Sequence, residues 1–170
     1  MSVLHETLWF LAEAVQRCPI GSDRDELIAT FDKIEGRTLL AAEEICGDAT
    51  DADCTAAIEL LGRASASIRS SKRAEPAAAR MRGALRIGVD MRGADLAYAD
   101  LGAAVLIGAD LTGADLTGAD LMCAELRGTK LYGADLSHAL FLTQAQVETA
   151  VGDASTVLSA PLRIPVHWAH

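Results

Sequence analysis

Leucine recurs at every fifth position from Leu96 to Leu136, nine times without a break. Alanine stands two residues before each of these leucines, except where Thr129 replaces it. Neither regular element repeats every five residues, since five steps along an α-helix rotate a side chain by about 140° and an odd period on a strand alternates the faces. All the leucines can lie on one side only if the chain turns once in every repeat. The period therefore predicts a coil that bends every five residues.

Each repeat also separates inward from outward positions. Alanine and leucine are two residues apart, so they point to the same side of an extended segment, and the residue between them points to the other side. That intervening residue is acidic in seven of the nine units, which predicts an apolar interior and an acidic exterior. Glycine at the fifth position permits the bend at each corner, and it occurs at Gly88, Gly93, Gly108, Gly113, Gly118, Gly128 and Gly133.

Four bends of five residues return the chain over its start, so that successive coils of 20 residues stack and hydrogen-bond to one another. Three coils spaced by about 4.8 Å make a stack roughly 15 Å tall. A stack this short depends on the segments that cap its ends, because an exposed rung invites edge pairing.

Residues 109–113 and 114–118 both read Ala-Asp-Leu-Thr-Gly, and with the units around them residues 89–143 resemble the pentapeptide-repeat family. The resemblance implies a right-handed quadrilateral β-helix. Residues 141–146 also resemble the ending of many bacterial pentapeptide-repeat proteins. Thr143 with the residues that follow it fits a capping box, which predicts a short helix that runs to about Val151.

The first third of the chain carries the spacing of helices instead. Apolar residues recur at intervals of four and three over residues 4–18. A second helix is expected after a cap at Ser22 or Asp23, and a third after a cap at Asp51 or Asp53. Three amphipathic helices joined by short loops make a small bundle with a shared core.

Together these patterns predict an α+β chain, in which an N-terminal three-helix bundle precedes a short right-handed quadrilateral β-helix with a C-terminal capping helix. The helical first third resembles no family. The expected boundaries are 1–72 for the bundle, 73–78 for a linker, 79–143 for the β-helix, and 144–170 for the cap and tail.

Arg86 interrupts the apolar interior near the start of the repeats, because it occupies a nominally inward position. Burying an unpaired guanidinium is strongly unfavourable. We therefore expect that the first coil is slipped or partly open, or that Arg86 reaches the end of the stack, where water is available.

Two outward faces are acidic once the repeats are sorted by their place in a coil. The candidate partner-binding carboxylates are Asp95, Asp115 and Asp135 on one face and Asp100 and Asp120 on another. Pentapeptide-repeat proteins associated with quinolone resistance resemble a DNA duplex in shape and charge and bind the basic DNA saddle of type II topoisomerases. The resemblance implies that these carboxylates could present such a pattern. The alternative is that they solubilise the coil and satisfy nearby backbone groups.

A third face breaks the acidic rule. It carries four branched apolar residues, Leu85, Ile87, Val105 and Ile107. A cluster of this kind on an outward face should not remain in water. We predict that this face docks the helical bundle or a second copy of the protein, as in a homodimer.

Composition limits the class of partner. The chain has a net charge of −9, spread over both halves, so it repels nucleic acid and favours a basic or apolar partner. The four cysteines form no CxxC pair and are expected as reduced thiols. No signal peptide and no apolar run of membrane-spanning length is apparent, which predicts a soluble, cytoplasmic protein without a membrane partner.

Catalytic and metal-binding patterns are weak. His167 and His170 suggest a metal site, but no further ligands lie near them in the sequence, so a loose terminal tail is the simpler expectation. His5 is expected on a helix surface and His138 on the outside of the coil. The chain shows no nucleophile with an orienting base and no phosphate-binding loop, which indicates neither an enzyme nor a cofactor.

These observations predict a non-enzymatic protein-interaction module. The main alternative is a DNA-mimic regulator of a type II topoisomerase, which follows from the family resemblance. A third alternative is an enzyme whose site lies where the bundle and the β-helix meet.

Overall fold

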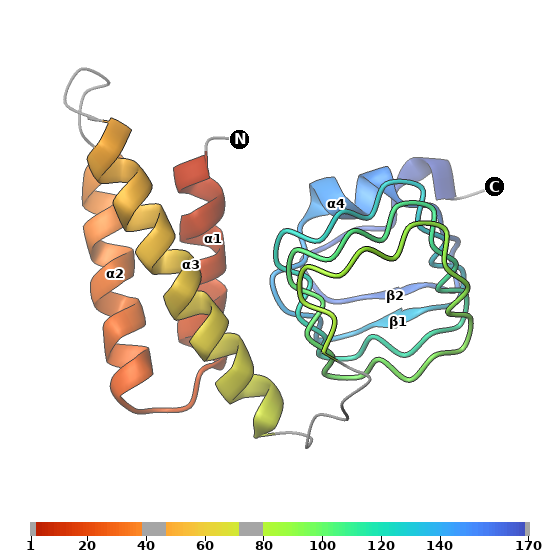
Figure 1. Cartoon of the computed structure of the whole chain (residues 1–170), viewed down its shortest axis with the longest axis horizontal. Helices are drawn as coiled ribbons and strands as arrows, with labels where there is room; N and C mark the ends of the chain where they lie inside the picture. Colours follow the sequence, from red (N-terminus) through yellow and green to blue (C-terminus); the bar gives the residue numbers. More distant parts are fainter. Residues whose placement is uncertain (1–2, 39–46, 72–79, 169–170) are drawn as a thin grey trace. The chain divides into compact units, whose positions relative to one another are not determined.

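The computed structural model describes residues 3–38, 47–71 and 80–168 of the chain (Figure 1). The chain separates into two compact units, Met1–Ser71 and Lys72–His170. The linker predicted at 73–78 lies outside the described residues. Among the helices in the described part, none is both long and apolar enough to cross a membrane.

Three helices that pack against one another form the first unit: α1 (Val3–Arg17), α2 (Ser22–Thr38) and α3 (Gly47–Ser70). Apolar side chains at helical spacing meet inside it, and Leu11, Leu27, Ile34 and Leu61 are fully buried. Their burial follows from the amphipathic pattern, because a helix of this kind is stable when its apolar stripe is covered. The arrangement agrees with the three helices predicted from the sequence.

The start of the third helix differs from the prediction. α3 begins at Gly47, ahead of both Asp51 and Asp53, so neither residue caps it. Asp53 is instead buried within the helix, and its Oδ1 accepts a hydrogen bond of 2.7 Å from the Nζ of Lys33 in α2. The carboxylate therefore joins two helices. α2 begins at Ser22, and the carbonyl of Gly21 accepts a 3.2 Å hydrogen bond from the N–H of Asp25, so Gly21 takes the capping position that was expected at Ser22 or Asp23.

The second unit is a stack of coils that run parallel to one another (Figure 1). Bridges join residues 20 apart, as from Asp95 to Asp115 and from Asp115 to Asp135. Hydrogen bonds between coils repeat along the stack; one of 2.8 Å runs from the N–H of Met81 to the carbonyl of Asp100. The backbone turns once in every five residues, as the leucine period requires.

The leucines that recur every five residues form the interior of the stack. All nine leucines from Leu96 to Leu136 are buried, with at most 6% of any of them exposed. Thr129 occupies the place of an alanine, and its hydroxyl donates a 2.8 Å hydrogen bond to the carbonyl of Leu106 on the preceding coil. The hydroxyl is thus satisfied inside an otherwise apolar interior.

The corners use the left-handed backbone conformation that favours glycine. At Gly113, for example, φ is 68°. Four corners adopt it without glycine, at Tyr98, Ala103, Cys123 and His138. This conformation costs a non-glycine residue about 1–2 kcal/mol. Glycine is therefore favoured at the corners of this coil but is not required at each of them.

The first coil is in register with the second. The N–H of Arg86 donates a 2.8 Å hydrogen bond to the carbonyl of Val105, as a regular repeat would. The side chain of Arg86 is exposed, and its Nη1 donates to the carbonyl of Leu85 at 3.2 Å. The prediction that Arg86 reaches water at the end of the stack is confirmed, and the prediction of a slipped coil is wrong.

A helix closes the other end of the stack. α4 (Gln144–Thr149) begins after Thr143, which forms the predicted capping box with Gln146. It ends two residues before the predicted limit, because Val151 rejoins the stack beside Lys130.

The chain beyond α4 also packs on this end. Strand β2 (Val157–Leu158) pairs in parallel with β1 (Asp135–Leu136), and the 3-10 helix η2 (Val166–Trp168) follows. Trp168 is 2% exposed, and its Nε1 donates a 3.0 Å hydrogen bond to the carbonyl of Ala150. The expectation of a loose tail is therefore wrong as far as Trp168, while His170 lies outside the described residues.

Candidate functional site

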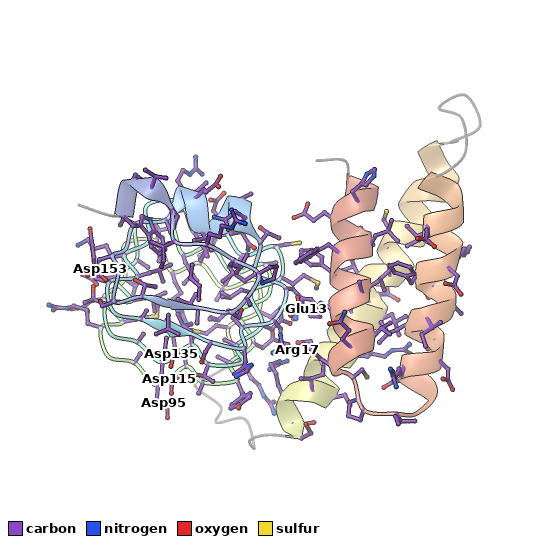
Figure 2. All side chains as sticks on the ribbon, turned by 180° about the vertical axis from the view of Figure 1, so that it is seen from behind. Glu13, Arg17, Asp95, Asp115, Asp135 and Asp153 are labelled. Atoms are coloured by element: carbon purple, nitrogen blue, oxygen red, sulfur yellow. The ribbon has the colours of Figure 1, made fainter. Side chains whose placement is uncertain are left out.

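The predicted carboxylate column is present on the outside of the coil. Asp95, Asp115 and Asp135 bridge in order, and Figure 2 shows their side chains one above the other. Asp95 and Asp115 are exposed and Asp135 is half-buried. The column ends where Asp135 pairs with Val157 of β2. Among the described residues it is therefore a stack of three carboxylates.

These carboxylates also have a local structural role. Asp115 accepts a 2.9 Å hydrogen bond from the N–H of Thr117, and Asp135 accepts one of 2.8 Å from the N–H of Ser137. The same bond occurs on another face, where Asp120 accepts from Met122 at 2.9 Å. A short aspartate side chain thus holds the turn that follows it. The interpretation that these residues satisfy the nearby backbone agrees with the structure, and it requires no partner.

Asp100 and Asp120 are bound by an arginine. The Nε of Arg82 donates to Asp100 at 3.0 Å and its Nη2 donates to Asp120 at 2.6 Å. The guanidinium lies against Gly102, where any Cβ would collide with it. Burial alone would lower the pKa of Arg82, but the carboxylates of Asp120 and Asp100 raise it above its ordinary value. Asp120 is fully buried in this arrangement.

The five candidate carboxylates therefore fall into two groups with different surroundings. Asp115 and Asp135 form no ion pair within the described residues and belong to the exposed stack. Asp120 cannot present its carboxylate to a partner while it is buried beside Arg82. Sequence reasoning missed Arg82, although its place in the 20-residue frame puts it one coil away from Gly102.

Another acidic face is also neutralised by cations. Arg92 holds Asp90 through its Nη2 at 2.7 Å, and Lys130 lies 3.3 Å from Asp110. The hydrogen bond from the Arg92 side chain lowers the pKa of Asp90 to about 2. The hydroxyl of Thr112 is the main cause that lowers the pKa of Asp110. This face presents paired charges and no uncompensated acidic surface.

The apolar face is present as predicted and is partly open to water. Leu85 is 69% exposed and Ile87 is 61% exposed, while Val105 and Ile107 are half-buried. The corner beside them is formed by glycines with open space around each, Gly88, Gly108 and Gly128. No corner side chain therefore shields the aliphatic residues on that side.

Reactive side chains are scattered. Within the described residues, no three His, Cys, Asp or Glu side chains lie close enough together to hold a metal ion. Cys18 and Cys54 are buried free thiols, and Cys123 is an exposed one. Burial raises the pKa of the Cys18 thiol, which makes it a poor nucleophile. Cys46 lies outside the described residues.

The histidines take surface positions. His5 is exposed on α1, and His138 is exposed at a corner of the coil, as predicted. The Nε2 of His167 lies 3.2 Å from the carbonyl of Ala150, so this ring takes part in the packing of the tail.

Comparison with known proteins identifies the repeat. A family model described as pentapeptide repeats matches residues 87–121 and 99–137, with eight copies. The coil of this chain therefore consists of pentapeptide repeats, and residues 87–137 belong to that family.

Two similar proteins extend the comparison. The chain is 48% identical over 169 residues to a protein of Bacillus subtilis (strain 168) named uncharacterized protein YybG, and the match covers 99% of this chain and 61% of that relative. The chain thus spans about three-fifths of the length of that relative. Among solved structures it is similar to HetL, a pentapeptide-repeat protein involved in heterocyst differentiation regulation in the cyanobacterium Nostoc sp. strain PCC 7120. That similarity has 29% identity and a TM-score of 0.33, and it covers 49% of this chain and 44% of HetL.

Proposed function

We propose that this chain is a non-enzymatic protein-interaction module built on its pentapeptide repeats. The apolar face carries the proposal, because Leu85 and Ile87 leave 69% and 61% of their surface in water above the half-buried Val105 and Ile107. Aliphatic groups clustered on one outward face mark interaction sites. A protein is the expected partner, since the net charge of −9 opposes nucleic acid.

We further propose that the coil is the right-handed quadrilateral β-helix that the family resemblance implies. The 20-residue interval between bridges and the turn at every fifth residue support this architecture. Its proposed limits are 79–143, between a helical bundle with its linker (1–72 and 73–78) and the cap and tail (144–170).

The experiment for the apolar face is a capture experiment from the native host with paired variants. Changing Val105 and Ile107 together to Asp places charge on the face, and we expect the captured protein to be lost while the coil still folds. The matched control changes Asp115 and Asp135 to Lys, which alters a different face and should leave that capture intact. Equal capture by both variants would show that the apolar face does not bind the partner. Faster proteolysis of residues 1–72 in the apolar variant would instead mean that the helical bundle occupies the face.

A second candidate is a DNA-mimic regulator of a type II topoisomerase, for which the stack of Asp95, Asp115 and Asp135 is the supporting observation. The stack is short, because three carboxylates about 4.8 Å apart span about 10 Å, or roughly three base-pair steps. Arg82 and Lys130 also neutralise the other two acidic faces. These features favour the general interaction module over the mimic.

A supercoiling assay separates the two candidates. A mimic should inhibit or protect the topoisomerase, and changing Asp95, Asp115 and Asp135 to Lys should abolish that effect. Unchanged supercoiling in a high excess of the wild-type chain would remove this candidate while leaving the interaction module in place.

The cellular setting follows from the same chemistry. We propose a soluble cytoplasmic protein that needs no cofactor and contacts neither nucleic acid nor membrane directly. The buried free thiols of Cys18 and Cys54 suit a reducing compartment.

A further inference from the structure

The side of the stack that bears the apolar face also bears an ion pair. Each coil contributes two outward residues to this side, and they flank an inward position such as Leu106 or Leu126. The outward residues form two columns, with Leu85, Val105 and Glu125 in the first and Ile87, Ile107 and Arg127 in the second. On the third coil, the Nη2 of Arg127 lies 3.5 Å from the Oε2 of Glu125. This side therefore carries aliphatic side chains on two coils and opposite charges on the next.

Small residues occupy the corners on both borders of this side. One border has Gly88, Gly108 and Gly128, and the other has Gly83, Ala103 and Cys123. A Cβ added at any glycine of the first border would meet nothing within 4 Å. The corner beside the exposed carboxylate stack differs, since it carries the rings of Tyr98 and His138. At the small-residue corners, therefore, no large side chain holds a second flat surface away from the apolar face.

A two-fold axis parallel to the stack allows this side to pack on itself. Such an axis sets each coil against the same coil of a second copy and exchanges the two columns. Leu85 then faces Ile87, Val105 faces Ile107, and Glu125 faces Arg127 of the second copy. Every contact joins two outward side chains, apolar against apolar or acid against base, as an isologous interface requires.

The other two-fold arrangement does not fit. An axis perpendicular to this side would reverse the stack and set the first coil against the third. Leu85 and Ile87 would then cover Glu125 and Arg127, which would lose water without gaining a polar partner. Burial of charges in this way is unfavourable. The order of residues along the columns therefore selects the arrangement in which both stacks run in the same direction.

We propose that the occupant of the apolar face is a second copy of this chain, packed side by side about a two-fold axis parallel to the stack. This inference rests on the proposal that the apolar face binds a protein, and it names that protein. Val105 and Ile107 form the centre of the contact. Glu125 keeps the Arg127 of its own chain and gains that of the second copy, since a carboxylate has acceptor capacity for both.

The size of this side sets the expected strength. Sheets that pack face to face lie about 10 Å apart, a distance that the long side chains of Glu125 and Arg127 span from both sides. Three coils about 4.8 Å apart make a contact roughly 10 Å tall, which is small beside the ~800 Å² that each partner contributes to a standard stable interface. Two chains with a net charge of −9 also repel each other. We expect a weak dimer that dissociates on dilution and, because the axis is two-fold, closes at two copies.

Sedimentation of the full chain over a concentration series tests the dimer. Wild-type protein should pass from monomer to dimer below about 1 mM, the range of weak complexes. Changing Val105 and Ile107 together to Asp should leave a monomer, because the two-fold axis then gathers carboxylates from both copies in an apolar contact. Circular dichroism checks that this variant remains folded.

Charge exchange on the third coil tests which residues face each other. Glu125→Arg alone and Arg127→Glu alone each set like charges opposite one another at two places in the dimer, and we expect the dissociation constant to rise on the order of tenfold. An equimolar mixture of the two variants should dimerise more tightly than either alone, since every facing pair then has opposite charges. Asp115→Arg is the matched control. It makes the same change in net charge as Glu125→Arg, at the same repeat position on another face, and should not weaken the dimer.

Three outcomes would overturn the proposal. One is wild-type protein that stays monomeric throughout the series, and another is a dimer that survives the change of Val105 and Ile107 to Asp. The third is a mixture of the charge variants that binds no more tightly than its components. A chain that stays monomeric yet needs Val105 and Ile107 for capture of another protein would exclude the second copy alone and leave the interaction module in place. Faster proteolysis of residues 1–72 in a monomeric apolar variant would assign the face to the helical bundle.

Discussion

The two ends of the coil differ in which side chains cover the last coil and bond to its backbone carbonyls. At the C-terminal end, the Nε2 of Gln146 donates to the carbonyls of Leu121 and Ala124, both at 2.8 Å. The hydroxyl of Thr156 donates to the carbonyl of Leu131 at 2.7 Å. At the N-terminal end, Leu85 and its neighbours remain exposed. A repeat stacks on another repeat but cannot finish the stack, so each end needs residues that depart from the repeat.

The largest expected effect is at the closed end. Trp168→Ala removes a buried ring that packs on Gly152 and the donor to the Ala150 carbonyl. We expect the free energy of unfolding to fall by about 3–5 kcal/mol. Urea denaturation of the full chain measures it. Val166→Ala, in the same 3-10 helix but 87% exposed, should change stability by less than about 0.5 kcal/mol. Similar losses in both variants would show that the tail does not seal the coil.

The next effect lies on the first coil. Arg82→Ala leaves Asp120 buried without its guanidinium partner. Removing one member of a buried pair costs about 3–5 kcal/mol, but Arg82 is partly exposed, so we expect a loss of about 1–3 kcal/mol. Arg127→Ala, which removes an exposed pair with Glu125, is the control and should have little effect. An equal fall in melting temperature in the two variants would mean that the buried pair of Arg82 and Asp120 stabilises the protein no more than the exposed pair does.

A smaller effect is expected at the cap itself. Gln146→Ala removes the capping box and the two hydrogen bonds to coil carbonyls. The expected loss is about 1–2 kcal/mol, from one cap and buried carbonyls left unpaired. Glu148→Ala, on an exposed position of the same helix, serves as the matched control in thermal denaturation. A stable Gln146→Ala protein would show that the rest of the tail closes this end by itself.

The smallest expected effect concerns the ion pair of Asp90 and Arg92 on the first coil. The pKa of Asp90 is lowered to about 2 by Arg92. Its contribution to stability is therefore present above the unfolded-chain pKa of about 3.9 and is lost as pH falls through about 2. In Arg92→Ala, a carboxyl NMR titration should find that the pKa of Asp90 rises toward its ordinary value but stays below it, because the backbone N–H of residue 92 still donates to this carboxylate. Asp153, whose pKa is lowered mainly by Ser155, is the internal control and should not move. An unchanged Asp90 titration would contradict the assigned cause.

Much of the coil could be predicted because its signals are local and repeated. The leucine period, the facing of Asp115 and the capping box at Thr143 each depend on residues within one or two repeats, and the structure has all three. The start of α3 was missed because several aspartates precede or enter that helix, and the sequence does not say which one caps it. Asp53 instead bonds to Lys33, which is 20 residues away on another helix.

The arginine site shows the same limit. Arg82 lies 18 residues from Asp100 and 38 from Asp120, and the structure brings the three together because each coil returns the chain above its start. Five carboxylates look equivalent in the sequence, but in the structure the side chain of Arg82 binds two of them, Asp100 and Asp120. That the tail lies over the surface could be expected from Trp168, but its burial against Gly152 could not, since only the folded tail brings these two residues together.

The sequence by itself determined that this chain must turn every five residues, with leucine and alanine inside, since no helix or strand can keep that period on one side. It also determined which residues share a face. The tertiary structure decided which of those faces remain accessible, because accessibility depends on residues one or more coils away. Arg82 covers one acidic face and Trp168 seals one end, whereas Leu85 and Ile87 on the apolar face remain exposed.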